Sequence, residues 1–203
     1  MLDSVPVLLP LILASASPRR HELMSLYGLP FEVAPARGPE NALGTGRERV
    51  QKIARDKCGE VAAQYPQRWV LAADTLVCVE EQILGKPKDA RDAAAMLRLL
   101  SGRWHDVYTG VCLRGPAGYL DSRAEATRVE FIPLSEDTIA RYVQTGEPMD
   151  KAGAYAIQGI SGIFISRIDG SPSNVMGLPL ALVGEMLQAA GLPLPLTPGP
   201  LGD

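Results

Sequence analysis

A long apolar run with a carboxylate near its centre is the strongest strand signal in the chain. Residues 69–79, WVLAADTLVCV, are apolar except for Asp74 and Thr75. A carboxylate inside such a strand is expensive to bury unless it is paired with a cation or bound to a metal. Because α/β folds place catalytic groups at strand ends, Asp74 is a candidate functional residue. The alternative is an Asp that caps a bulge or turn. Thr75 points to the opposite face if the strand is regular.

The rest of the sequence alternates helix and strand patterns. We expect a strand over 11–14, then a helix that begins after Ser17 with Pro18 at its first position and is closed by Gly28. Further expected elements are a loop over 32–46, helices over 46–65, 90–101, 136–145 and 179–190, and strands at 83–84, within 105–113 and 119–132, and over 163–168. Two hairpins among these elements favour a mixed α/β sheet flanked by helices over a purely parallel sheet.

The chain of 203 residues suits one large domain or two small lobes. No internal repeat or linker marks a boundary, so residues 11–190 are interpreted as one domain, with an N-terminal extension, 1–10, and a Pro-rich C-terminal tail, 191–203. The apolar stretch 5–14 is not expected to be a signal peptide, because Asp3 is the only charge before it. No apolar run reaches the length of a membrane-spanning helix.

Composition narrows the possible partners and cofactors. A formal net charge of −3 and an aromatic share of 5% argue against nucleic acid or an anionic membrane as a partner. The three cysteines, Cys58, Cys78 and Cys112, form no CxxC pair and are expected to be reduced core residues of a cytosolic protein. Two histidines are too few for a His-rich zinc site. Any catalytic metal would be a hard cation held by carboxylates and phosphate oxygens.

Four cations stand at positions that suit a polyphosphate. Arg19 and Arg20 lie in the first turn of a predicted helix, where free N–H groups favour anions, although a solvated surface pair is the alternative. Lys57 falls on the apolar stripe of the next helix, so it either extends outward to solvent or points into a cleft. Lys86 follows a glycine in a turn, which alone indicates only a turn. Together with Asp74 they favour a Mg²⁺-bound polyphosphate, with Asp74 as general base or metal ligand.

Several segments, taken in order, resemble the Maf family of nucleoside triphosphate pyrophosphatases over residues 11–190. The matching segments are LASASPRR at 13–20, the helix around Lys57, ADT at 73–75, LGKP at 84–87, LSG at 100–102 with His105 and TGV at 109–111, GEP at 146–148 with DKAGAY at 150–155, and SNV at 173–175 with GLPL at 177–180. The resemblance implies an α/β fold with a cleft between two lobes. It implies hydrolysis of a nucleoside triphosphate between the α and β phosphates, a divalent cation such as Mg²⁺ or Mn²⁺, a cytoplasmic location and a homodimer.

The resemblance also assigns roles to individual residues. Asp74 is the expected proton acceptor. The positions linked to base selection are Arg19, Thr75 and Gln158, and the phosphate-contacting ones are Arg20, Lys57 and Lys86, with Ser17 as a further substrate-binding candidate. The family usually carries an acidic pair in the loop after the first helix, and only Glu40 remains of it here. Glu40 and Asp74 are therefore the candidate metal ligands.

The loop over 150–159, DKAGAYAIQG, points to one branch of the family. Members that act on dTTP and UTP carry this loop and an SNV stretch before GLP, so the resemblance favours these two substrates or modified pyrimidine triphosphates. The Gln158 amide has a donor and an acceptor, which suit a pyrimidine carbonyl and N3–H. The alternatives are a 7-methyl-GTP-type pyrophosphatase and a non-catalytic regulator of septum formation.

Overall fold

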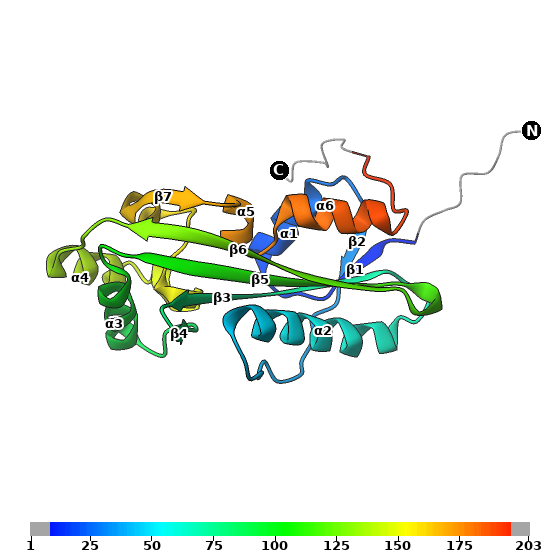
Figure 1. Ribbon diagram of the computed structural model, residues 1–203, viewed down its shortest axis with the longest axis horizontal. Helices are drawn as coiled ribbons and strands as arrows, with labels where there is room; N and C mark the ends of the chain where they lie inside the picture. The colour runs from blue at the N-terminus through cyan, green and yellow to red at the C-terminus, as the bar shows by residue number, and fades with distance from the viewer. Residues whose placement is uncertain (1–8, 196–203) are drawn as a thin grey trace, which may run out of the picture.

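The computed structural model describes residues 9–195, which build one seven-stranded sheet flanked by helices (Figure 1). The strands are β1 Leu11–Leu13, β2 Phe31–Val33, β3 Val70–Val79, β4 Gln82–Leu84, β5 Trp104–Arg114, β6 Leu120–Phe131 and β7 Ile165–Asp169. The α-helices are α1 Pro18–Ser25, α2 Gly46–Gln64, α3 Ala90–Leu100, α4 Glu136–Gln144, α5 Pro172–Val175 and α6 Leu180–Ala189. Short 3₁₀ helices span η1 Pro116–Gly118, η2 Glu147–Asp150, η3 Ala152–Ala154 and η4 Ile160–Phe164.

The sheet is mixed, as the two predicted hairpins indicated. Its strand order is β2-β1-β3-β5-β6-β7, with β4 paired to β3 beside this path. β1 is parallel to both β2 and β3, whereas the pairs β3–β4, β3–β5, β5–β6 and β6–β7 are antiparallel. The long strands β3, β5 and β6 run through the whole molecule and join its two halves (Figure 1).

Helices cover the sheet differently in the two halves (Figure 1). In the half that holds both ends of the described chain, α1 and α6 pack on one face around Leu23, Met24 and Met186, and α2 packs on the other face through Ala54 and Cys58. In the other half, α3 and α4 enclose a separate core with the 3₁₀ segments that follow α4. The described chain therefore has three hydrophobic clusters on one continuous sheet, two on opposite faces of one half and one in the other half, with a junction between the halves.

Alternation along β3 determines where its two polar residues point. Val70 and Ala72 pack on the α2 side of the sheet, and Leu71 and Ala73 pack on the α1 and α6 side. Because successive side chains of a strand alternate between faces, Asp74 lies on the α2 side and Thr75 on the α1 side. The expectation that Asp74 and Thr75 point to opposite faces is confirmed by their contacts, given below.

The starts of three helices are capped by the side chain of the residue that precedes them. Thr45 and Glu48 form a complete capping box at the start of α2. The Asp89 carboxylate accepts the Asp92 N–H at 2.8 Å at the start of α3, and the Ser135 hydroxyl accepts the Thr138 N–H at 3.1 Å at the start of α4. These caps satisfy N–H groups that have no partner inside the helix.

Two expectations for the first sixty residues are wrong in part. Residues 32–46 are not all loop, because Phe31–Val33 pairs in parallel with β1 through its backbone while its side chains stay largely exposed, which leaves no apolar pattern to read. The first helix begins at Pro18 as predicted, but the Ser17 side chain makes no cap hydrogen bond. The Ser17 N–H instead donates to the Ser15 hydroxyl at 3.2 Å.

Two further differences lie after residue 159. The strand expected over 163–168 begins only at Ile165, because η4 occupies the preceding residues. The four-residue helix α5 was not predicted, and its start is capped by the Ser171 hydroxyl, which accepts the Asn174 N–H at 3.3 Å. The N-terminal extension and the Pro-rich tail lie largely outside the described residues.

Cys58, Cys78 and Cys112 are buried and free, as expected. Over residues 9–195, no helix combines the length and the apolar character needed to cross a bilayer.

Candidate active site

A cavity of about 520 Å³ lies between the two halves of the molecule. Its walls come from the turn between β1 and α1, the loop before α2, the centre of β3, the turn after β4 and the segments around residues 150–158 and 175–177. All nine site residues expected from the sequence line it: Ser17, Arg19, Arg20, Glu40, Lys57, Asp74, Thr75, Lys86 and Gln158. The fold thus brings together residues that lie up to 141 positions apart in the sequence.

Lys57 holds the two carboxylates of the site. Its Nζ atom lies 2.8 Å from Oδ1 of Asp74 and 2.8 Å from Oε1 of Glu40. The side chains of Lys57 and Asp74 are only 13% and 8% exposed, whereas that of Glu40 is 64% exposed. The hydrogen bond from Lys57 lowers the pKa of Glu40 below its ordinary value. The lysine on the apolar stripe of α2 is therefore a cleft cation, and it offsets the buried charge of Asp74.

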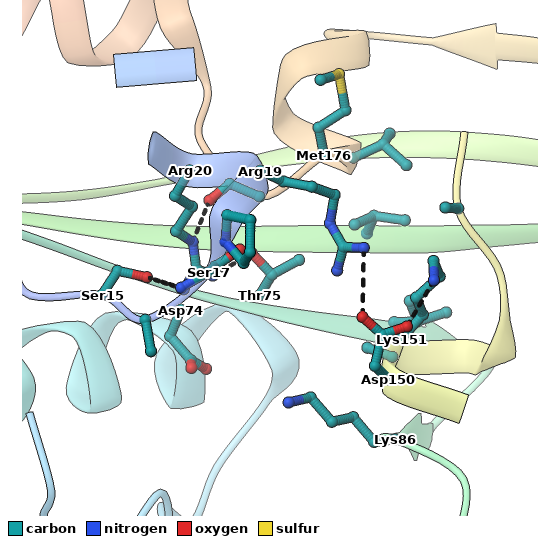
Figure 2. A pocket seen from close by; sticks show the side chains of 18 of the residues that line it. Ser15, Ser17, Arg19, Arg20, Asp74, Thr75, Lys86, Asp150, Lys151 and Met176 are labelled. Atoms are coloured by element: carbon teal, nitrogen blue, oxygen red, sulfur yellow. Dashed lines mark hydrogen bonds and ion pairs between the residues drawn. The ribbon is translucent and has the colours of Figure 1, made fainter. Parts of the chain in front are cut away.

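All three nitrogens of the Arg20 guanidinium donate hydrogen bonds, which fix the side chain in place. Nε donates to the carbonyl of Gly177 at 2.8 Å, Nη2 donates to Oγ1 of Thr75 at 3.0 Å, and Nη1 donates to the Ser15 hydroxyl at 3.4 Å (Figure 2). Burial lowers the pKa of Arg20, and the negative charge of Asp74 works in the opposite direction. The guanidinium remains charged because its ordinary pKa is so high. The planar fork is held in place before any anion arrives.

A buried hydroxyl network supports Thr75 from below. Oγ1 of Thr75 lies 2.9 Å from Oγ1 of Thr109, which donates to the Asn174 carbonyl at 2.9 Å. The Asn174 amide in turn donates to the Val107 carbonyl at 2.9 Å and to the Thr127 hydroxyl at 3.0 Å. The network ties β3, β5, β6 and α5 together directly under the cavity.

An ion-pair chain crosses the side of the cavity opposite Asp74. Asp150 lies 3.9 Å from Arg19 and 2.5 Å from the Nζ atom of Lys151 (Figure 2). The hydrogen bond from Lys151 lowers the pKa of Asp150. Lys151 also donates to the Glu147 carbonyl at 2.6 Å. Arg19 comes from one half of the molecule and Asp150 from the other, so this chain links the two halves.

Lys86 and Gln158 complete the lining. The Lys86 side chain extends into the cavity toward the side where Asp74 lies (Figure 2). Its turn is tied to the opposite segment because the Gly153 N–H donates to the Gly85 carbonyl at 3.0 Å. Gln158 is exposed at the cavity wall, on the loop between Tyr155 and η4.

The donor set fits a hard divalent cation only in part. Glu40 and Asp74 each bind the Lys57 ammonium through one carboxylate oxygen, which places the two carboxylates beside each other in the cavity. No group of three or more His, Cys, Asp or Glu side chains within residues 9–195 is placed to hold a metal ion. Two carboxylates completed by phosphate oxygens and water are the usual arrangement for Mg²⁺. The residues therefore fit a cation that arrives with a phosphate ligand.

Sequence reasoning found four of the five cations that line the site but missed Lys151, Asp150 and the contacts that support the others. Ser15 and the Gly177 carbonyl hold Arg20, and Asn174 stands under Thr75. Asp150 and Lys151 belong to the loop over 150–159, of which only Gln158 was expected to line the site. The sequence before Asn174, with Ser171 and Pro172, is typical of a capped helical turn and could have indicated α5. Nothing in the sequence, however, indicates a contact between Asn174 and the hydroxyl network of Thr75.

The mixed sheet and its central cavity define an α/β protein whose cavity suits a polyanion. Five cations, Arg19, Arg20, Lys57, Lys86 and Lys151, surround one buried carboxylate in a chain of negative net charge. The chain belongs to the Maf family: the family model described as Maf-like protein matches residues 10–190.

Relatives in several bacteria cover nearly the whole chain. A dTTP/UTP pyrophosphatase of Myxococcus xanthus is 49% identical over 187 residues, covering 91% of this chain and 94% of the relative. A dTTP/UTP pyrophosphatase of Anaeromyxobacter dehalogenans is 50% identical over 190 residues, covering 91% and 96%. Among solved structures, the Ham1 protein of Staphylococcus aureus is similar in fold, with a TM-score of 0.52 at 15% identity, covering 90% of this chain and 100% of that one.

Proposed function

We propose that this protein hydrolyses dTTP and UTP to the nucleoside monophosphate and pyrophosphate. The observation that carries the proposal is the buried Asp74 at the centre of a cavity lined by five cations. The cavity suits a nucleotide in size and a polyphosphate in charge. The names of the relatives, which are about half identical over nearly the full chain, support the same substrates.

Asp74 is the residue that we assign as general base. Lys57 occupies its Oδ1 atom, so Oδ2 is the oxygen that accepts a proton from water. The water oxygen bonds to the α-phosphorus, the bond from that phosphorus to the bridging oxygen breaks, and pyrophosphate leaves with the electron pair. Lys57, Arg20 and Lys86 stabilise the negative charge that develops on the phosphate oxygens.

Glu40 and Asp74 are the residues that would hold a divalent cation. Such a cation, when bound, neutralises part of the triphosphate charge and polarises the phosphorus–oxygen bonds. The Glu40 carboxylate stays ionised well below neutral pH because Lys57 lowers its pKa, which keeps it available as a ligand. Metal dependence is part of this proposal, as are a homodimer and a cytoplasmic location.

Base selection is assigned to Gln158, Arg19 and Thr75, which all line the cavity. Gln158 carries an amide that donates to a carbonyl and accepts from an N–H, which matches O4 and N3–H of thymine and uracil. Arg19 and Thr75 lie on the α1 side of the cavity, where they limit how the nucleotide lies. A site that hydrogen-bonds a polar group rejects ligands that leave its own groups unpaired.

The test is pyrophosphate release from dTTP, UTP, CTP, GTP, 7-methyl-GTP and ATP with Mg²⁺ or Mn²⁺. We expect release from dTTP and UTP that Asp74→Asn reduces by at least 10²-fold, with nucleotide binding retained. Asp56→Asn is the matched control, because Asp56 is an exposed residue of the same region that pairs with Lys52. Activity confined to 7-methyl-GTP would overturn the substrate assignment. No release from any nucleotide would overturn the enzymatic proposal and favour a binding protein such as a regulator of septum formation.

A further inference from the structure

One carboxylate holds the far end of the loop that carries Gln158. Oε2 of Glu147 accepts the Ile160 N–H at 3.0 Å, and Oε1 accepts the Ser161 N–H at 3.3 Å and the Ser161 hydroxyl at 3.2 Å. The hydroxyl of Tyr142 on α4 also donates to Oε1, at 3.1 Å. Glu147 thus gathers four donors, three of which belong to the two residues that begin η4.

The loop itself is closed at its base. The buried Ser161 hydroxyl shares its one proton between the Ala156 carbonyl, at 2.8 Å, and Oε1 of Glu147, and it accepts the Ala156 N–H at 2.9 Å. Between these two residues the chain makes a short excursion that carries Gln158 to the cavity wall. Because Glu147 binds Ser161, it fixes the base of this excursion relative to α4.

The backbone of Gly159 lies so close to the Glu147 carboxylate that no side chain fits between them. Its φ of +121° is open to glycine and strained for other residues. A Cβ atom at this position would also lie 2.8 Å from Oε1 of Glu147. Gly159 follows Gln158 directly, so the contact with Glu147 constrains the backbone beside the base-reading amide.

The charge of Glu147 is maintained by its partners. Burial works against the ionised form, but the N–H groups of Ile160 and Ser161 outweigh it, and the net effect lowers the pKa of Glu147. Charge-assisted hydrogen bonds of this kind are about twice as strong as neutral ones. On the other side of the loop, Tyr155 is fixed by a 2.7 Å hydrogen bond to Nε2 of His105. The excursion is therefore anchored at both ends.

Discrimination between thymine and cytosine needs a fixed amide. Thymine presents a carbonyl and an N–H at positions 4 and 3, and cytosine presents an amine and a bare nitrogen there. A glutamine amide that is free to turn over satisfies either pattern. The loop must therefore hold the Gln158 side chain in one position if the site is to prefer dTTP.

We infer that Glu147 is a positioning residue for base selection, acting on the substrate through the backbone that carries Gln158. The inference rests on the proposed function, since it assigns the discrimination between thymine or uracil and cytosine within the same site. Glu147 does not line the cavity. Its effect on substrate is therefore indirect.

The test compares kcat/KM for dTTP and dCTP in wild type, Glu147→Gln, Gln158→Ala and the double variant. Glutamine has the same shape but turns an NH₂ group toward the N–H groups of the loop. We expect Glu147→Gln to lower the dTTP to dCTP ratio by about tenfold, mainly by raising KM for dTTP. In the Gln158→Ala background the same change is expected to lower the ratio no further, because the group that Glu147 positions is gone.

Matched variants separate positioning from general damage. Glu136→Gln changes an exposed glutamate that pairs with Arg98 and is expected to leave the ratio unchanged. Ser161→Ala removes the clamp on Ala156 and the hydroxyl contact to Glu147 but keeps both backbone N–H contacts of that carboxylate. It is expected to lower the ratio as well, and it serves as the test variant if Glu147→Gln does not fold. An unchanged ratio in folded Glu147→Gln, or equal losses with both nucleotides, would overturn the inference. A wild-type protein inactive on dTTP and UTP would instead contradict the proposed function.

Discussion

The Nζ atom of Lys57 lies 2.8 Å from Oδ1 of Asp74, in a nearly buried pair that joins α2 to the centre of β3. Each residue supplies the opposite charge that the other needs in order to be buried. An ionised aspartate at the centre of an apolar strand needs a cation, and a lysine on the apolar stripe of a helix needs an anion. The pair therefore holds a charged carboxylate in the floor of a cavity, where it can act on substrate and still be stable.

Removal of one partner of this pair is expected to cost more than removal of both. Lys57→Met leaves Asp74 buried without its cation and should lower the free energy of unfolding by about 3 kcal/mol. Adding Asp74→Asn removes the unpaired charge and should recover part of that loss. Urea denaturation of the two single variants and the double variant measures the coupling. Strictly additive losses would show that the two charges do not depend on each other.

Arg20 should not tolerate lysine although the charge is kept. Its guanidinium uses separate nitrogens to contact Gly177, Thr75 and Ser15, and a single ammonium cannot reproduce that fork. We expect Arg20→Lys to raise KM for dTTP by roughly 10- to 100-fold. Arg91→Lys, an exposed residue of α3, serves as the control and should leave KM unchanged. A KM for Arg20→Lys close to that of wild type would mean that charge alone suffices.

We expect Glu40 to affect the binding of the divalent cation rather than the binding of the nucleotide. Its carboxylate lies beside that of Asp74, since both bind the Lys57 ammonium, and the hydrogen bond from Lys57 lowers its pKa. Chelation with EDTA is expected to stop pyrophosphate release and added Mg²⁺ to restore it. Glu40→Gln should raise the Mg²⁺ concentration for half-maximal activity by about tenfold, since a charged hard ligand is lost. An unchanged Mg²⁺ requirement in this variant would remove Glu40 from the metal ligands.

The charged residues of the site were predictable because their positions break local patterns. Asp74 interrupts an apolar strand, Lys57 interrupts an apolar stripe, and Arg19 and Arg20 stand in the first turn of a helix. Each position is costly unless it has a use, so a single sequence makes it visible. The helix that begins at residue 46 was predictable for a similar reason, since the Thr45 and Glu48 side chains that cap it interact within a single turn.

The parts that sequence reasoning missed depend on contacts between distant segments. The backbone carbonyl of Gly177 that accepts from Arg20 leaves no trace in a residue type. The strand β2 is held by pairing with β1 rather than by an apolar pattern of its own. Asn174 reaches Val107 and Thr127 only after α5 packs against β5 and β6. Contacts of this kind form only when distant segments pack together, so the spacing of residues within one segment does not predict them.

Gly110 should be essential for the approach of α2 to the sheet. A Cβ atom at this position of β5 would lie 2.3 Å from the carbonyl carbon and oxygen of Val50, which are backbone atoms that cannot turn aside. Gly110→Ala is therefore expected to push α2, and with it Lys57, away from β3 and to lower the free energy of unfolding by about 3 kcal/mol. Gly85→Ala has open space around its Cβ and is the matched control for stability. Equal melting temperatures for the two variants would contradict this account.

Acid should destabilise the protein through His105. Burial lowers the pKa of His105 to about 4, from an ordinary value of 6.5. Between these two pH values the unfolded chain binds a proton that the folded protein does not, so the free energy of unfolding rises with pH in this window. Acidification from pH 6.5 to pH 4 should therefore cost the fold about 3 kcal/mol at this residue.

The same change should loosen the loop beside the cavity, because the neutral His105 ring is the partner of the Tyr155 hydroxyl. His105→Gln keeps a polar partner for Tyr155 and has no proton to gain, so its stability should vary less between pH 4 and pH 6.5. Thermal unfolding of both proteins across that range measures the difference directly. Carboxylates that become protonated between pH 6.5 and pH 4 are the same in both proteins, so their effect on stability cancels in the comparison. Parallel pH profiles for wild type and His105→Gln would show that His105 is not the group responsible.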